Sequence, residues 1–102
     1  MIIVNTTFHI PLPLKNSLAA WLRDVYAPSA LAAGHRSPRT ARVLGGAGDV
    51  EGCSVAFQTE APTLAEARKW HDGEAGRLRI ELARQLGPDK LAFFTTYLQT
   101  ID

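Results

Sequence analysis

Four side chains of this 102-residue sequence carry groups that hold or transform small molecules: Asn5, Tyr26, Trp70 and His71. His71 falls within an apolar helical stripe, and an imidazole there could bind a ligand or transfer a proton near neutral pH. The alternative is a core histidine with hydrogen-bonded ring nitrogens. We expect Asn5, Tyr26 and His71 near one pocket between helices and sheet, although packing in the core is the ordinary role for Tyr26. Trp70, on the flank of its helix, would cover a cleft or be partly exposed.

Other kinds of site lack the residues that they need. Cys53 is the only cysteine, so neither an intrachain disulfide nor a zinc site of several thiolates is available, and we expect a small buried side chain. Metal-ligating residues do not cluster, so we expect no metal and no cofactor. The glycines of "GGAGD" match neither a dinucleotide-binding fingerprint nor a phosphate loop, because a strand-like segment follows them.

The charge balance gives no reason to expect nucleic acid or a membrane as a partner. The net charge is +1, and no apolar run approaches the roughly 20 residues that cross a bilayer. No signal peptide is visible, so we expect a cytoplasmic protein. The stretch "EGCSVAFQ" places Glu51, Cys53 and Val55 where an RNA-recognition motif needs a basic residue and stacking aromatics.

The elements that must position the candidate residues are four strands and two helices. The sequence predicts strands at 2–10, where apolar residues alternate, and at 37–44, 50–60 and 91–101. The second and third strands are joined by the glycine-rich stretch, which suits a hairpin.

The two helices are predicted from apolar residues at three- and four-residue spacing. The first begins near Pro13, and Pro28 should end or kink it near Ala27, with Gly34 as its final stop. The second begins at the capping box "TLAE" and ends at Gly87. Its apolar stripe consists of Leu64, Ala67, His71, Ala75, Leu78, Leu82 and Leu86. Gly73 and Gly76 lie inside it, at a soft middle or a close approach of another backbone.

The resulting order, βαββαβ over residues 1–102, predicts a single α+β domain of the ferredoxin-like kind. Right-handed crossovers place both helices on one face of a four-stranded antiparallel sheet. The length suits one domain.

The second face of this sheet has no helices to cover it. The first strand places Ile3, Asn5, Thr7 and His9 on one side, and the last strand carries large apolar residues on both sides. An apolar patch of that size is unusual on a free monomer, so we expect two copies to pack sheet against sheet. The candidates for this dimer face are Thr7, His9, Phe93 and Tyr97. The alternative is a monomer with one hydrated sheet face.

The stretches "MIIVNTTFHI", "WLRDVYAPSAL" and "YLQTID" resemble a bacterial family of unknown function, domain-of-unknown-function family 4286. That family is similar to the dimeric α/β-barrel group, in which two ferredoxin-like subunits join through their sheets. The resemblance implies a homodimer. It implies no activity, since the family has none assigned.

The dimeric α/β-barrel group includes cofactor-free quinol monooxygenases and haem-degrading enzymes. The latter use an Asn on the first strand together with a Trp and a His, and Asn5, Trp70 and His71 match these in type. Trp70 and His71 are adjacent, so they point about 100° apart on a helix and cannot both face one haem as in those enzymes.

The sequence therefore predicts an uncharacterised small homodimer with a small-molecule pocket between helices and sheet. One alternative is a non-catalytic interaction or regulatory module, whose sheet surface is purely a contact. Another is a cofactor-independent, monooxygenase-like enzyme. A cavity shared by Asn5 and His71 would favour the pocket, and the sequence does not decide whether the protein is an enzyme.

Overall fold

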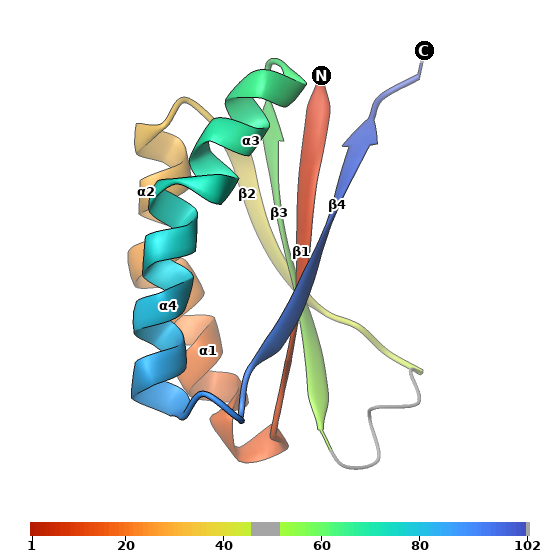
Figure 1. The fold of residues 1–102 in the computed structure, drawn as a ribbon. Helices are drawn as coiled ribbons and strands as arrows, with labels where there is room; N and C mark the ends of the chain where they lie inside the picture. Colours follow the sequence, from red (N-terminus) through yellow and green to blue (C-terminus); the bar gives the residue numbers. More distant parts are fainter. Residues whose placement is uncertain (46–51, 102) are drawn as a thin grey trace.

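The order of elements along the chain is βαββαβ, as Figure 1 shows. The structure is a computed structural model that describes residues 1–45 and 52–101. Most of the expected glycine-rich connection, Glu51 and the start of the strand expected over 50–60 lie outside the described residues. The helices cover one face of the sheet and leave the other face open.

The sheet has four strands, and every neighbouring pair is antiparallel. The strands are β1 (Ile2–Ile10), β2 (Arg36–Arg42), β3 (Cys53–Ala61) and β4 (Ala92–Gln99), in the spatial order β2-β3-β1-β4. Because β1 is central, its alternate residues meet the helices on one side and the open face on the other. This arrangement confirms the predicted ferredoxin-like fold.

The first helical segment passes through Pro28 by changing its winding. It comprises a 3₁₀ turn (Leu12–Leu14), α1 (Lys15–Trp21), a π-helical turn η2 (Leu22–Tyr26) and α2 (Ala27–Ala32). Proline has no N–H to donate to the carbonyl four residues earlier, and in the π turn the Ala27 N–H donates to the Leu22 carbonyl, five residues back. The end or kink expected near Ala27 thus takes the form of a π turn.

The second helical segment is not the continuous helix that the sequence predicts. It consists of α3 (Leu64–Asp72) and α4 (Glu74–Leu86), with the break at Gly73. A Cβ atom at Gly73 would lie 2.7 Å from the Lys69 carbonyl oxygen, so the break requires glycine. The predicted cap is confirmed, since the Glu66 N–H donates to Thr63 Oγ1 at 3.1 Å.

The core lies between the helices and the covered face of the sheet. Its main cluster includes Phe8, Trp21, Tyr26, Phe57 and Trp70, and a smaller one consists of Ile2, Val4, Ala61 and Ala67. Cys53 is fully buried in the main cluster, as expected of a small apolar side chain. None of the helices in the described part of the chain has the length and hydropathy needed to span a membrane.

The open sheet face mixes apolar and polar side chains. Phe94 and Leu98 of β4 are 63% and 43% exposed, and Leu98 pairs with Ile3 across the neighbouring strand. Gln58 Nε2 donates to Asn5 Oδ1 at 3.1 Å. We call this surface the open sheet face.

Candidate functional site

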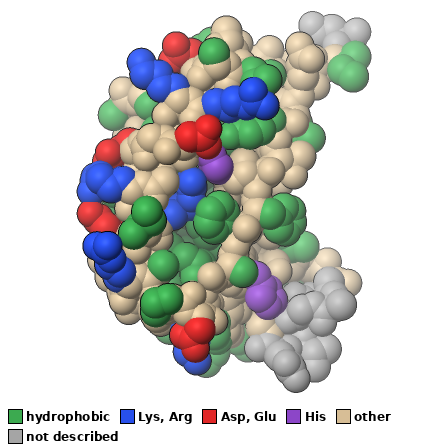
Figure 2. Space-filling model, viewed as in Figure 1, with side chains coloured by type: hydrophobic (Ala, Val, Ile, Leu, Met, Phe, Trp, Pro, Cys, Tyr) green, Lys and Arg blue, Asp and Glu red, His purple; other side chains and the backbone are tan. Residues whose placement is uncertain are grey.

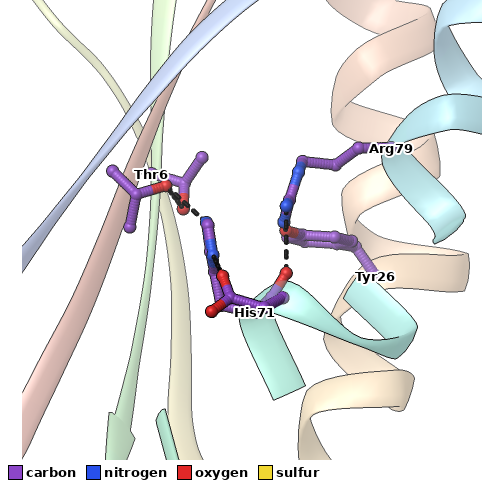
Figure 3. Close-up of polar contacts among 6 residues, drawn as sticks. Thr6, Tyr26, His71 and Arg79 are labelled. Carbon is purple, nitrogen blue, oxygen red and sulfur yellow. Dashed lines mark hydrogen bonds and ion pairs between the residues drawn. The ribbon is translucent and has the colours of Figure 1, made fainter. Parts of the chain in front are cut away.

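A chain of polar groups connects α3 to the sheet, and Figure 3 shows how they lie. His71, near the C-terminal end of α3, is 9% exposed. Its Nε2 atom lies 2.7 Å from Thr95 Oγ1 on β4, and Thr95 Oγ1 lies 2.9 Å from Thr6 Oγ1 on β1. The helix is therefore joined by hydrogen bonds to two adjacent strands.

The protonation state of His71 follows from its surroundings. Its Nδ1 atom lies 2.9 Å from Asp72 Oδ1, and a carboxylate can only accept, so Nδ1 carries the proton. Burial lowers the pKa of His71, and the neighbouring Asp72, which raises it, does not reverse the shift. The ring is neutral at pH 7, and Nε2 accepts from the Thr95 hydroxyl.

Arg79 of α4 is the one Lys, Arg, Asp or Glu side chain that is buried in the described chain, at 8% exposure. Its Nη1 donates to Tyr26 Oη at 2.8 Å, and its Nη2 donates to the His71 carbonyl at 2.9 Å. The guanidinium carbon lies 4.7 Å from the centre of the Phe93 ring. Both hydrogen-bond acceptors of Arg79, a phenol hydroxyl and a backbone carbonyl, are uncharged.

The charge of Arg79 has no anionic partner. None of the ion pairs between described residues includes it, and its Nε atom is buried without an acceptor. Removing an unpaired charge from water costs several kcal/mol. The two neutral acceptors and the aromatic face offset part of such a cost.

Tyr26 is fully buried and holds Arg79 in place. The π turn directs its ring among Phe8, Trp21 and Phe57, with the Trp21 ring stacked at a centroid distance of 4.8 Å. Burial raises the pKa of Tyr26, although Arg79 acts in the opposite direction. Its hydroxyl is thus a neutral acceptor for the Arg79 guanidinium.

Trp70 is buried rather than partly exposed, and it lines a surface depression between α2 and α4. Its Nε1 donates to Ser29 Oγ at 3.0 Å, and its ring packs edge-on against His35 at 4.9 Å. Ser29 belongs to α2, so this contact holds the two helical segments together. Trp70 therefore has a full set of packing and hydrogen-bond partners within the core.

A surface pocket of about 330 Å³ lies between α4 and β4, with Arg79 in its wall. We call it the α4–β4 pocket. The other lining residues are Gly76, Ile80, Ala83, Leu91 and Phe93. In Figure 2, hydrophobic side chains gather on this side of the molecule between the helices and β4. The pocket is thus apolar apart from one buried cation, and its volume is at the small end of the range for ligand sites.

A larger depression of about 520 Å³ lies on the outer side of the helical layer. Val25, Pro28, Ala32, Trp70, Glu74 and Leu78 line it. The Trp70 indole already donates to Ser29, and Glu74 forms an ion pair with Arg77. No group in this wall shares the unpaired charge of Arg79, so it offers a ligand less specific recognition.

The structure separates the residues expected around one pocket. Tyr26, Trp70 and His71 lie between the helices and the sheet, whereas Asn5 faces the open side and bonds to Gln58. No single bound molecule can contact both Asn5 and His71 within one subunit without crossing the sheet.

The four residues expected at the dimer face also divide between the two sides. Thr7 and His9 lie on the open sheet face, where His9 Nδ1 is 3.1 Å from Ser54 Oγ. Phe93 and Tyr97 face the helices, where their rings lie 6.1 Å from Phe8 and 5.8 Å from His71, respectively. The large apolar residues that β4 presents on the open face are Phe94 and Leu98.

Sequence reasoning missed Arg79, Thr95 and Thr6. A signal existed for Arg79, since it lies four residues after Ala75 and three before Leu82 in the apolar stripe. These intervals place Arg79 on the side of the helix that carries the apolar stripe. Thr95 had no comparable signal, because its partner His71 is distant in sequence.

The hydrogen bonds of Asp72, His71 and Thr95 have the order of a carboxylate–imidazole–hydroxyl triad. A nucleophile also needs open space for the reacting carbon beside its hydroxyl. Thr95 lines neither the α4–β4 pocket nor the outer depression. We therefore assign the three residues to positioning α3 on the sheet.

Comparisons with known proteins place the chain in a family. A family model described as a domain of unknown function, DUF4286, matches residues 1–101. The chain belongs to this family. The family expected from the opening, helical and terminal motifs is thereby confirmed, and no curated protein matches the DUF4286 chain.

Solved structures share the fold of this DUF4286 chain. One is an ethyl tert-butyl ether (EthD) family protein from Bacillus halodurans, with a TM-score of 0.60 and 12% identity, covering 99% of this chain and 100% of that protein. Another is Rv0793 from Mycobacterium tuberculosis, with a TM-score of 0.61 and 17% identity, covering 100% and 97%. At these identities the likeness concerns the fold alone.

Proposed function

We propose that this DUF4286 protein is a homodimer that binds a small molecule in the α4–β4 pocket of each subunit. The observation that carries the binding proposal is the buried guanidinium of Arg79, which lacks an anionic partner and lines the pocket. An apolar concavity with a few convergent polar groups is characteristic of small-molecule binding sites.

Homodimer formation is supported by the exposed apolar residues of the open sheet face. Phe94 and Leu98 pair with Thr7 and Ile3 of β1 and lie on the side that the helices leave uncovered. Pairing two such faces would remove these residues from water, and the resemblance to dimeric α/β-barrel proteins points the same way.

Binding is favoured over catalysis by the state of the titratable groups near the pocket. Both ring nitrogens of His71 already have partners, and Tyr26 is fully buried with its hydroxyl bonded to Arg79. Asn5 and His71, whose shared cavity would favour a pocket between helices and sheet, lie on opposite faces of the sheet, so the pocket that we propose is a different one, between α4 and β4. The interaction-module alternative relies on the open sheet face alone and predicts no ligand at Arg79.

A fragment screen by thermal shift, repeated with two blocking variants, tests the pocket. Ala83→Trp places an indole in the α4–β4 pocket, and Ala32→Trp does the same in the outer depression. We expect ligands that raise the melting temperature of the wild type to lose their effect in Ala83→Trp and to keep it in Ala32→Trp.

The same screen can contradict the proposal in two ways. Hits that survive Ala83→Trp but not Ala32→Trp would move the site to the outer depression. A screen in which no fragment stabilises the wild type would leave the interaction module as the better account.

A further inference from the structure

We infer that the ligand of the α4–β4 pocket is an amphipathic monoanion, a carboxylate attached to an apolar body. This inference rests on the proposed binding function and specifies the chemical class of the ligand. It follows from the charge state, the free donors and the apolar walls of the pocket.

Arg79 has more hydrogen-bond donors than the described residues use. A guanidinium has five N–H groups and stays protonated in proteins. The structure uses two of them, one on the Tyr26 hydroxyl and one on the His71 carbonyl. The Nε–H group is buried with no acceptor among the described residues. The N–H groups left for a ligand in the pocket are therefore the second ones on Nη1 and Nη2, together with the positive charge that they share.

The arrangement of these donors favours a carboxylate as the acceptor on the ligand. The N–H groups of a guanidinium form a planar fork that matches the two oxygens of a carboxylate. Charge-assisted hydrogen bonds of this kind are about twice as strong as neutral ones. Because Arg79 is itself buried, this attraction is screened less than it would be between two exposed charges.

Apart from Arg79, the walls of the α4–β4 pocket are apolar. Ile80 is 57% exposed and Phe93 45% exposed, so both leave hydrocarbon surface for a ligand to cover. Leu91 and Ala83 complete the wall without any further charge. One positive charge among apolar groups matches one negative charge on an apolar molecule, whereas a phosphate dianion would leave excess charge desolvated.

The test compares ligands that differ only in the head group. The probes are octanoate, octanamide, octylamine and octyl phosphate, with 4-phenylbutyrate as an aromatic carboxylate. Binding to the full chain is measured by isothermal titration calorimetry in about 0.15 M salt, a usual physiological ionic strength. We expect octanoate to bind on the order of ten to a hundred times more tightly than octanamide, and octylamine not to bind.

Two variants of α4 locate the preference. Arg79→Met removes the buried charge, and Arg84→Met removes an exposed arginine from the same helix. We expect the preference for octanoate over octanamide to disappear in Arg79→Met and to remain in Arg84→Met. If Arg79→Met does not fold, the head-group comparison on the wild type still decides the inference.

The outcomes separate the inference from the proposed function. Equal binding of octanoate and octanamide, blocked by Ala83→Trp, would overturn the anion inference and keep the pocket. Tighter binding of octyl phosphate than of octanoate would replace the carboxylate by a phosphate. No binding by any of the five probes would overturn the inference, and the fragment screen would then judge the pocket independently.

Discussion

At the scale of single residues, the interior of this protein is unusual for the polar groups that it buries. Arg79, His71 and His35 are all buried between the helices and the sheet. Arg79 and His71 share hydrogen bonds with Tyr26, Thr95 and a backbone carbonyl. His35 has a partner for one ring nitrogen only, since its Nδ1 lies 2.9 Å from Thr59 Oγ1 and its Nε2 has no partner in the described chain.

The buried histidines should make the stability of the protein depend on pH. Burial lowers the pKa of His35 below its ordinary 6.5, although Glu66 of α3 acts in the opposite direction, and burial likewise lowers the pKa of His71. Below pH 6.5 the unfolded chain therefore binds protons that the folded chain does not, so stability falls as the pH decreases from 6.5 toward the folded pKa values. Above pH 6.5 the two histidines do not make the stability of the protein depend on pH.

Urea denaturation at pH 7.5 and pH 5.5 measures this dependence. We expect the wild type to lose stability at the lower pH, and His35→Asn to lose less, because an amide keeps the contact with Thr59 but does not titrate. An equal loss of stability in the wild type and in His35→Asn would show that His35 does not contribute to this pH dependence.

At the scale of elements, two local departures from α-helical winding position the site. The π turn before Pro28 places Tyr26 in the core, and the break at Gly73 ends α3 just after His71. The last carbonyls of a helix lack partners within it, and Arg79 donates to the His71 carbonyl from the next helix. Each departure therefore positions a group that accepts a hydrogen bond from Arg79, namely Tyr26 Oη or the His71 carbonyl.

Substituting the two glycines of this segment should have opposite effects. Gly73→Ala would bring its Cβ to 2.7 Å from the Lys69 carbonyl oxygen, and we expect it to destabilise the protein by about 1–3 kcal/mol. The matched control is Gly76→Ala, whose Cβ would meet no heavy atom closer than 3.6 Å. Alanine is the better helix former, so this change should be neutral or stabilise by up to about 1 kcal/mol.

Chemical denaturation of the two glycine variants checks the prediction. A stabilising Gly73→Ala would mean that the two helices can join into one, and the tight contact at Lys69 would then not be the reason for the break.

At the scale of the whole molecule, one layer of helices leaves one sheet face without cover. Phe94 and Leu98 are the large apolar side chains that β4 exposes there, and the polar pair Asn5 and Gln58 lies on the same face. Such a face suits a second copy of the sheet, with the hydrogen-bonded amides retained inside the interface.

The proposed dimer should dissociate when a charge is placed on the open sheet face. Phe94→Glu would bury an unpaired carboxylate between the two sheets, and we expect dimerisation to weaken by more than about tenfold. The matched control is Leu31→Glu, since Leu31 is 51% exposed on α2 in the other layer. Sedimentation equilibrium at micromolar concentrations measures both variants against the wild type.

A wild type that sediments as a monomer at these concentrations would contradict the proposed dimer. Equal weakening by Leu31→Glu would instead place the interface on the helices.

The fold of this protein was predictable because its signals are local. Alternation along 2–10, the capping box at Thr63 and the positions of Pro28 and Gly34 are properties of neighbouring residues, and the structure keeps the order that they predict. The break at Gly73 was not predictable from spacing, because it depends on how closely the backbone approaches the Lys69 carbonyl.

The amino-acid sequence by itself determined the ferredoxin-like order and the apolar stripes, since periodicity fixes which residues share a face. Only the tertiary structure decided that Asn5 and His71 lie on opposite sides of the sheet, that Phe93 and Tyr97 face the helices, and that Arg79 is buried beside a pocket. These facts depend on contacts between segments far apart in the chain, such as that of Arg79 with Tyr26. A local sequence pattern does not show whether a buried charge will meet an opposite charge from a distant segment.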